Sequence, residues 1–227
     1  MRSTQKLYVL VLLFILDIAQ AQSGSVTYNI SSNFAGQMQT HLETESEQQV
    51  ARSIEKKMNQ YRIRIDFCAD RSVSKPIEPL ELQGQKLPGF AKSRVRRYSV
   101  YFYDRIHKRL VEEKLYRENC TTETITETQW EIIPDSTKTI AGYPCRLAVA
   151  SWSTTTRRNG TKTVRVPAWF APSLPFPYGP LRFVGLPGVV LEVKYNMNVI
   201  SASEVAIDYD IETDCRIPEP QGDCGEN

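Results

Sequence analysis

Histidine, the usual base for a serine or cysteine nucleophile, is scarce in this 227-residue chain. The only histidines are His41 and His107, and neither stands near a recognisable nucleophile motif such as Gly-x-Ser-x-Gly. Because a serine or cysteine nucleophile needs a base held against it, we interpret both histidines as surface residues. The sequence therefore predicts no catalytic residue of this class.

Residues that bind metals or cofactors are also sparse. No His-Glu-x-x-His, Cys-x-x-Cys, phosphate-loop or dinucleotide-binding glycine pattern occurs in the chain. Met38 and His41 would give a copper ion only two ligands, which is too few. We predict neither a metal site nor a cofactor.

Carboxylate or thiol chemistry is the alternative that the composition leaves open. Acidic residues such as Glu112-Glu113, Asp208 and Asp210 stand on or beside expected strands. Such groups usually form the solvated face of a sheet. A hydrolase would need two facing carboxylates in a cleft, or Cys145 exposed beside a base. We therefore favour a protein that is not an enzyme, with a hydrolase as the alternative.

The cysteine count bears on disulfide bonding, because the five cysteines form an odd set. They are Cys68, Cys120, Cys145, Cys215 and Cys224. At least one is free or pairs with another chain. Cys215 and Cys224 stand nine residues apart beside prolines and a glycine, so they are the first candidate pair. A second pair among the other three stays open, because spacing does not define connectivity.

The N-terminus has the three parts of a secretory signal peptide. Arg2 and Lys6 precede an apolar run from Leu7 to Leu16, and Ala19-Gln20-Ala21 supplies small residues for cleavage before Gln22. Ten apolar residues are too few to span a membrane, which takes about 20. No cysteine follows the run as a lipid-attachment site. We predict an exported, soluble mature chain without a lipid anchor.

The mature chain carries nearly balanced charge. Removal of residues 1–21 leaves 26 basic and 25 acidic side chains, so nothing indicates a nucleic-acid partner. The basic run from Lys92 to Arg97 is short, and a solvated strand edge or loop explains it.

Strand patterns dominate the mature sequence. Residues 61–67 are the clearest case: Tyr61, Ile63, Ile65 and Phe67 share one face, and charged residues share the other. Asn159-Gly160 is a strong hairpin signal, because both residues tolerate positive φ. The expected strands are residues 25–30, 61–67, 98–103, 109–117, 126–133, 145–156, 162–170, 189–195 and 199–208, with Pro134-Asp135 ending the fifth.

Two stretches depart from the strand pattern. Leu42, Val50, Ile54 and Met58 recur at multiples of four, which predicts a surface helix within residues 41–58, although its cap signals look poor. The stretch from Ser74 to Lys92 contains three prolines and two glycines, and we expect a surface loop or insertion there.

These elements predict a mainly β fold: a single antiparallel, curved sheet, with a half-barrel as one form, and at most one or two short helices. The domain should span residues 22–217. Residues 218–227 should form a flexible tail unless the Cys215–Cys224 bridge fixes it.

The most distinctive stretch is a stiff aromatic and proline-rich run over residues 168–192. Pro172, Pro175, Pro177 and Pro180 cannot donate ladder hydrogen bonds, so this run cannot be a central strand. Large aromatic groups stand on this stiff backbone. They are Trp169, Phe170, Phe176, Tyr178 and Phe183. This run is a candidate wall of an apolar groove, or an architectural segment that delivers the next strand to the core.

The same run resembles the GLPGLI family of secreted Bacteroidetes proteins. The name motif stands here as Gly185-Leu186-Pro187-Gly188-Val189-Val190. Upstream, Trp169-Phe170, Gly179-Pro180, Trp130 and the stretch from Gly142-Tyr143 to Cys145 are similar to the family pattern. The resemblance covers residues 126–193. It implies an exported, β-rich protein of a Gram-negative envelope, without assigned chemistry, in which Gly185, Leu186, Pro187, Gly188, Trp130 and Gly142 are structural.

Taken together, the sequence predicts a non-enzymatic envelope protein of the periplasm or outer-membrane surface. It would bind an envelope protein or an apolar ligand through the five aromatic residues. A purely structural secreted protein is a further alternative. Burial of the five aromatic residues would favour that alternative.

Overall fold

A computed structural model describes residues 23–77, 99–116, 119–156, 160–208 and 217–220. Their strands form one eleven-stranded antiparallel sheet in the order β6-β5-β4-β3-β2-β1-β11-β10-β9-β8-β7. The strands are β1 (Ser23–Ser32), β2 (Arg62–Phe67), β3 (Arg71–Ile77), β4 (Val100–Asp104), β5 (Arg109–Tyr116), β6 (Asn119–Ile125), β7 (Trp130–Ile140), β8 (Tyr143–Thr156), β9 (Gly160–Ala171), β10 (Val189–Tyr195) and β11 (Asn198–Asp208).

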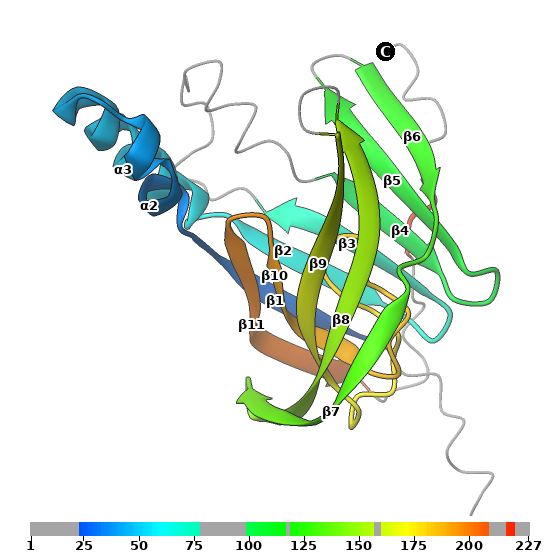
Figure 1. The fold of residues 1–227 in the computed structure, drawn as a ribbon. Coiled ribbons are helices and arrows are strands. Elements are labelled where there is room, and N and C mark those ends of the chain that lie inside the picture. The colour runs from blue at the N-terminus through cyan, green and yellow to red at the C-terminus, as the bar shows by residue number, and fades with distance from the viewer. Residues whose placement is uncertain (1–22, 78–98, 117–118, 157–159, 209–216, 221–227) are drawn as a thin grey trace, which may run out of the picture.

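The sheet is strongly curved but is not closed, because β6 and β7 remain as its two edges. In Figure 1, one arm formed by β3–β6 and a second arm formed by β7–β9 stand on either side of a concave inner face. The predicted mainly β fold with a single curved antiparallel sheet is confirmed.

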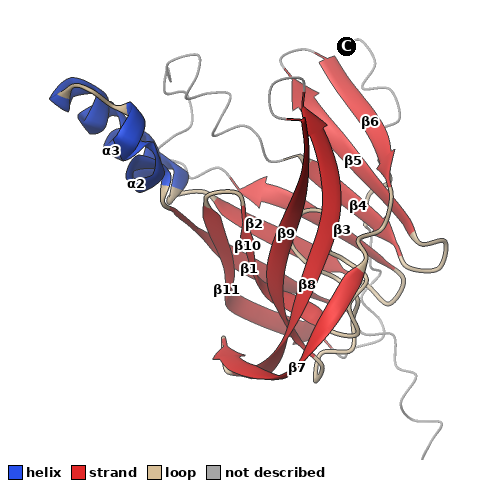
Figure 2. Ribbon diagram, in the orientation of Figure 1, coloured by secondary structure: helices blue, strands red, loops and turns tan. Residues whose placement is uncertain are grey.

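Two α-helices lie at one end of the sheet, α2 (Phe34–Met38) and α3 (Glu45–Met58), separated by a 3₁₀ turn, η1 (Gln39–His41). Figure 2 shows both helices beyond the ends of the strands. The predicted helix is confirmed in α3, but the assessment of its caps was wrong. Thr44 and Glu47 form a capping box, in which each side chain accepts a hydrogen bond from the other residue's backbone N–H.

The residues expected on the apolar side of α3 are only partly buried. Ile54 and Met58 are buried together with Ala51, whereas Val50 remains 43% exposed. The acidic start of α3 and its basic last turn, with Lys56 and Lys57, suit the helix dipole.

Three strands differ from the sequence predictions. β3 occupies the start of the expected loop, since Ser74 and Pro76 pair with residues of β2. β6 was not predicted. β7 continues past Pro134 to Ile140, with an irregular register between Ile133 and Thr137. Proline is tolerated there because β7 is an edge strand and the pairing is interrupted at that point.

The hairpin predicted at Asn159-Gly160 is present, and the last two expected strands form another. β8 pairs with β9 up to Thr156 opposite Gly160, and β10 pairs with β11 up to Tyr195 opposite Asn198. Gly160 has φ +65°, and Asn196 in the second turn has φ +55°. Residues 157–159 lie outside the described part of the chain.

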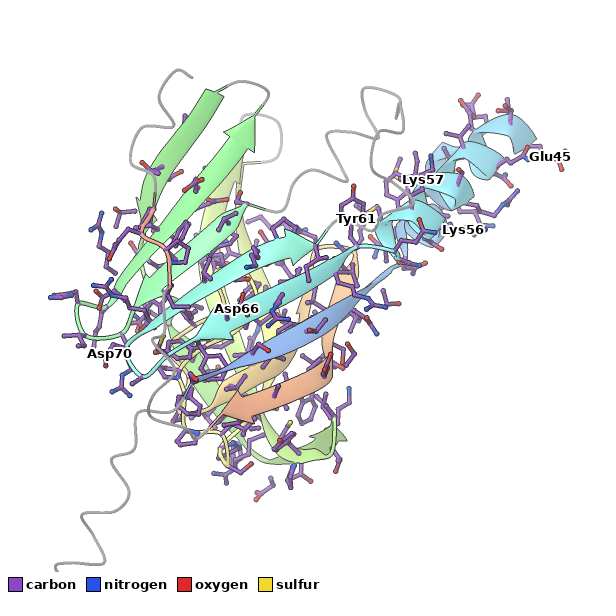
Figure 3. All side chains as sticks on the ribbon, turned by 180° about the vertical axis from the view of Figure 1, so that it is seen from behind. Glu45, Lys56, Lys57, Tyr61, Asp66 and Asp70 are labelled. Carbon is purple, nitrogen blue, oxygen red and sulfur yellow. The ribbon has the colours of Figure 1, made fainter. Side chains whose placement is uncertain are left out.

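Alternation along the strands separates a buried inner face from a charged outer face. On β2, Ile63, Ile65 and Phe67 are almost completely buried. Asp66 lies on the outer face of β2 (Figure 3), where Arg64 and Lys75 hold its carboxylate at 2.6 and 3.0 Å. Although burial opposes ionisation, these two cations lower the pKa of Asp66. The inner face therefore provides the core and any internal site.

Several predicted segments lie outside the described residues. They are the signal peptide (residues 1–21), residues 78–92 of the expected loop and most of the expected tail. Within residues 217–220, Glu219 forms an ion pair with Arg71 of β3. Within the described ranges, no helix has the length and apolar character needed to cross a membrane.

Candidate functional site

Residues 172–188, here called the bridging segment, connect β9 to β10 across the inner face. The Leu181 N–H donates to Ser74 Oγ on β3 at 2.9 Å. On the other arm, Trp130 Nε1 of β7 donates to the Val184 carbonyl at 2.8 Å. The bridging segment therefore ties the two arms together.

Tyr178 anchors the bridging segment at the turn between β2 and β3. Its fully buried hydroxyl lies 2.8 Å from the Cys68 carbonyl oxygen and 2.9 Å from that of Ala69. The Tyr178 ring also packs against Phe67 and Phe176, with centroid separations of 5.4 and 6.3 Å. Burial raises the pKa of Tyr178, so its hydroxyl stays a neutral donor.

The glycine motif shapes the end of the bridging segment. Gly185 has φ +92°, and a Cβ there would lie 2.8 Å from Glu127 Oε1. A Cβ on Gly188 would lie 2.3 Å from the Ala171 carbonyl oxygen, so β9 and β10 meet only because no side chain is present. Leu186 is buried and Pro187 is exposed. The geometry suits the structural role that the resemblance implies.

The five aromatic residues predicted to bind a partner do not lie on one exposed surface. Phe170, Phe176, Tyr178 and Phe183 are buried. Trp169 remains partly exposed on the outer face, with Lys138 Nζ 5.8 Å from its ring centroid. Burial of four of the five favours the architectural interpretation, and their binding role remains a prediction.

A different set of side chains remains partly exposed on the inner face. We call it the inner cluster. It consists of Tyr101, Glu112, Trp152, Arg182 and Tyr195. Strand register places Tyr101 opposite both Ser74 and Glu112, and therefore on the face that contacts the bridging segment. No motif in the sequence predicted these residues as a binding site.

Glu112 is the acidic centre of the cluster. Its Oε1 accepts hydrogen bonds from Ser99 Oγ at 2.6 Å and from the Tyr101 hydroxyl at 2.9 Å, and Lys114 Nζ lies 3.5 Å from its other oxygen. Burial, followed by the charge of Glu112, raises the pKa of Tyr101. Tyr101 therefore stays protonated and serves Glu112 as a donor.

Arg182, on the bridging segment, is the basic centre of the cluster. Its guanidinium carbon lies 5.2 Å from the centroid of the Trp152 ring. Its Nε is buried and has no hydrogen-bond partner. Among the described residues, no acidic side chain forms an ion pair with Arg182, although its positive charge contributes to the lowered pKa of Glu123 on β6.

Aromatic rings complete the surroundings of Arg182. Tyr195 lies 6.1 Å from Trp152 and 5.2 Å from Phe183, measured between ring centroids. Phe183 in turn packs 6.3 Å from Trp130. The inner cluster therefore combines one cation that forms no ion pair with a described carboxylate and a largely aromatic environment.

The carboxylates required by the hydrolase alternative do meet, but in an unfavourable electrostatic setting. Glu112 of β5 stands opposite Glu123 of β6, and Lys114 contacts both, with Nζ 2.6 Å from Glu123. The Lys114 hydrogen bond lowers the pKa of Glu123. A general acid needs a raised pKa instead, so this pair does not favour acid–base hydrolysis.

The thiol and histidine candidates also lack a catalytic setting. Cys145 is 1% exposed, and burial raises the pKa of its thiol to about 11, which disfavours a thiolate nucleophile. His107 is exposed at a turn, with Nδ1 2.8 Å from Asp104. The side chain of His41 lies outside the described part of the structure. No group of three metal-ligating side chains occurs among the residues that the structure describes.

The cysteines divide into two kinds. Cys145 is a free thiol, whereas Cys68 is disulfide-bonded. The side chain that Cys68 bonds is not among those that the structure describes. The predicted Cys215–Cys224 pair lies outside the described residues and remains a prediction.

Comparison with known proteins gives one family match. A family described as a protein of unknown function (Porph_ging) matches residues 150–192. These residues include Trp152, Arg182 and the whole bridging segment. The match is consistent with the GLPGLI resemblance but covers less than half of the chain and assigns no activity. No curated protein and no solved structure matches the chain.

Proposed function

We propose that this chain is an exported, non-enzymatic binding protein of a bacterial envelope, and that the inner cluster is its ligand site. One observation carries the proposal: the guanidinium of Arg182 lies over Trp152 in a partly exposed position, and no described carboxylate forms an ion pair with it. Buried or half-buried charges are normally paired, so a lone arginine among aromatic rings suits a ligand that supplies the missing group.

The fold supplies a rigid frame for such a site. Tyr101 and Glu112 come from the first arm, and Trp152 comes from the second. The bridging segment carries Arg182 between the arms, with its backbone fixed at Leu181 and Val184. A site built on strands and a fixed segment can bind without reorganising its backbone.

Export is the second part of the proposal, and the N-terminal sequence supports it. Arg2, Lys6, the apolar run and Ala21 form a secretory signal, and the GLPGLI resemblance favours the periplasm or outer-membrane surface. Fractionation of the native host, followed by N-terminal sequencing, tests this part. We expect a mature chain that begins at Gln22 in the envelope fraction, whereas an uncleaved cytoplasmic chain would contradict export.

The binding part is tested by replacing two aromatic members of the inner cluster. Purified wild type and the Trp152→Ala and Tyr195→Ala variants would be compared for bound small molecules by native mass spectrometry of protein from the envelope. Thr163→Ala, at an exposed position of β9, is the matched control. We expect a bound mass in wild type and control that both variants lose while folded. Equal retention by all folded variants would reject the inner cluster as the site.

A structural protein is the second candidate, and the buried bridging segment favours it. Four of five aromatic residues of the predicted binding run are core residues. On this alternative the inner cluster would hold nothing, and wild type would carry no bound molecule under any condition of the same experiment.

A further inference from the structure

We infer that the ligand of the inner cluster is an amphipathic anion, with its carboxylate or phosphate head group on Arg182 and its apolar body against the aromatic rings of the cluster. This inference rests on the proposed function and deepens it, because it names the chemical class that the site would bind. The expected ligand is a small molecule with one anionic head group.

The charge of the head group follows from the surroundings of Arg182. Guanidinium groups bind carboxylate and phosphate oxygens in a planar, two-pronged arrangement. The charge of Arg182 contributes to the lowered pKa of Glu123, but that carboxylate and Glu112 are already engaged by other groups. Glu112 accepts from Ser99 and Tyr101, and Glu123 is held by Lys114 at 2.6 Å. Arg182 is therefore left with donors that an incoming oxyanion can use.

The contact of Arg182 with the face of Trp152 leaves guanidinium N–H groups available for such an anion. A cation over an aromatic face is attracted by the ring quadrupole, but the ring accepts no in-plane hydrogen bonds. Trp152 therefore orients the guanidinium without using its in-plane donors. The same arrangement recurs where arginine recognises planar anions.

The backbone around Arg182 is held from three sides. Leu181 adopts φ +59°, a left-handed conformation that leucine rarely takes, and its N–H is bonded to Ser74. The Arg182 carbonyl accepts hydrogen bonds from Thr128 Oγ1 and from the Val184 N–H. Unusual backbone conformations persist where neighbouring contacts determine them, often at ligand sites. The guanidinium is thus placed in advance of binding.

The aromatic rings beside the guanidinium indicate that the ligand has an apolar body. Trp152, Tyr195 and Phe183 present rings with centroids 5.2–6.1 Å apart. Trp152 and Tyr195 are partly exposed, so their rings can gain contacts when a ligand covers them. A fully hydrophilic anion would leave these rings exposed to water, whereas an amphipathic one would bury them.

The test compares probes that share one chain and differ in the head group. Binding of dodecanoate, monododecyl phosphate, dodecanol and dodecylamine to the full mature chain would be measured by isothermal titration calorimetry below their micelle-forming concentrations. We expect the two anions to bind at least tenfold more tightly than dodecanol and dodecylamine. The ratio of the affinities for the two anions then assigns the head group to the carboxylate or phosphate class.

Variants then assign the preference to one side chain. Arg182→Gln should reduce the affinity for the preferred anion to that for dodecanol, and Arg182→Lys should restore part of it. Arg165→Gln, an exposed arginine of β9, is the matched control and should bind as wild type does. Near-ultraviolet circular dichroism checks that each variant is folded.

Each outcome separates this inference from the proposed function. Equal binding of dodecanol and dodecanoate by wild type overturns the anionic head group but leaves a binding protein. An anion preference that persists in folded Arg182→Gln places the head group elsewhere and also overturns the inference. If no probe binds and no mass accompanies the protein from its host, both the inference and the proposed function fail. The wild-type comparison stands even if Arg182→Gln does not fold.

Discussion

The guanidinium carbon of Arg182 and the ring centroid of Trp152 are 5.2 Å apart, although the two residues belong to different elements of the fold. Trp152 stands on β8, whereas Arg182 is delivered by the bridging segment, which is fixed to β3 and β7. The contact therefore exists only when the sheet has curved and the segment has crossed its inner face.

Tyr178→Phe tests the anchor of the bridging segment. The change removes the hydroxyl that reaches the Cys68 and Ala69 carbonyls and leaves the ring packing in place. We expect the free energy of unfolding to fall by about 1–3 kcal/mol, because two partly buried carbonyls lose their donor. Urea denaturation measures it, with Tyr143→Phe at a partly exposed position as control. A loss no larger than that of the control would show that the anchor is not needed.

Gly188→Ala and Gly142→Ala form a matched pair for the glycine motif. A Cβ at Gly188 would lie 2.3 Å from the Ala171 carbonyl, whereas a Cβ at Gly142, with φ +85°, would have no heavy atom within 4 Å. We expect Gly142→Ala to cost about 1–2 kcal/mol for backbone conformation alone. Gly188→Ala should cost more, because β9 and β10 must separate. Thermal unfolding would contradict the close approach if both variants lost equal stability.

Cys145 makes the fold sensitive to alkaline pH. Burial raises the pKa of its thiol from 9.0 to about 11. Below pH 9 the thiol is protonated in both states and its contribution is fully present. As pH rises from about 9 to 11, the unfolded chain ionises first, and this contribution to stability is lost.

Urea unfolding at pH 8 and pH 10.5 measures the effect of Cys145. Wild type should lose stability between these values, and Cys145→Ala should lose less. Tyr28, Tyr101, Tyr103 and Tyr178 also have raised pKa values, so part of the alkaline loss should remain in the variant. An identical loss in both proteins would show that the thiol does not titrate as stated.

Cys68 gives a prediction about covalent connectivity. Cys120 belongs to β6, four strand positions from β2, which is about 19 Å across the sheet. A disulfide needs Cα atoms within about 7 Å. Since Cys145 is free, we expect Cys68 to pair with Cys215 or Cys224, close to the Arg71–Glu219 ion pair.

Non-reducing peptide mapping by mass spectrometry tests this pairing. It should recover a peptide containing Cys68 linked to one from the C-terminal region. Recovery of a Cys215–Cys224 peptide instead would exclude it and restore the pair that spacing alone suggests.

The strand pattern could be predicted because most strands bury one face. Residues 61–67 alternate strictly, and β2 follows with Ile63, Ile65 and Phe67 inside. β3 escaped prediction because Ser72, Val73 and Ser74 are all buried, so no alternation marks it. Thr44 and Glu47 did carry a visible capping-box spacing, which locates the start of α3.

The inner cluster could not be predicted for a different reason. Tyr101, Trp152, Arg182 and Tyr195 come from separate elements, and no local spacing links them. Only the curvature of the sheet and the path of the bridging segment bring them together. The aromatic run was conspicuous in the sequence because it builds the core, while the partly exposed site comes from less conspicuous residues beside it.

The indole N–H resonances of the three tryptophans, followed by NMR during a dodecanoate titration, test the inner-face site most directly. Trp152 lies against Arg182, whereas Trp169 lies on the outer face beside Lys138. We predict that the Trp152 resonance shifts in a saturable way and that the Trp169 resonance stays in place. A saturable shift of Trp169 with no change at Trp152 would contradict a ligand site on the inner face.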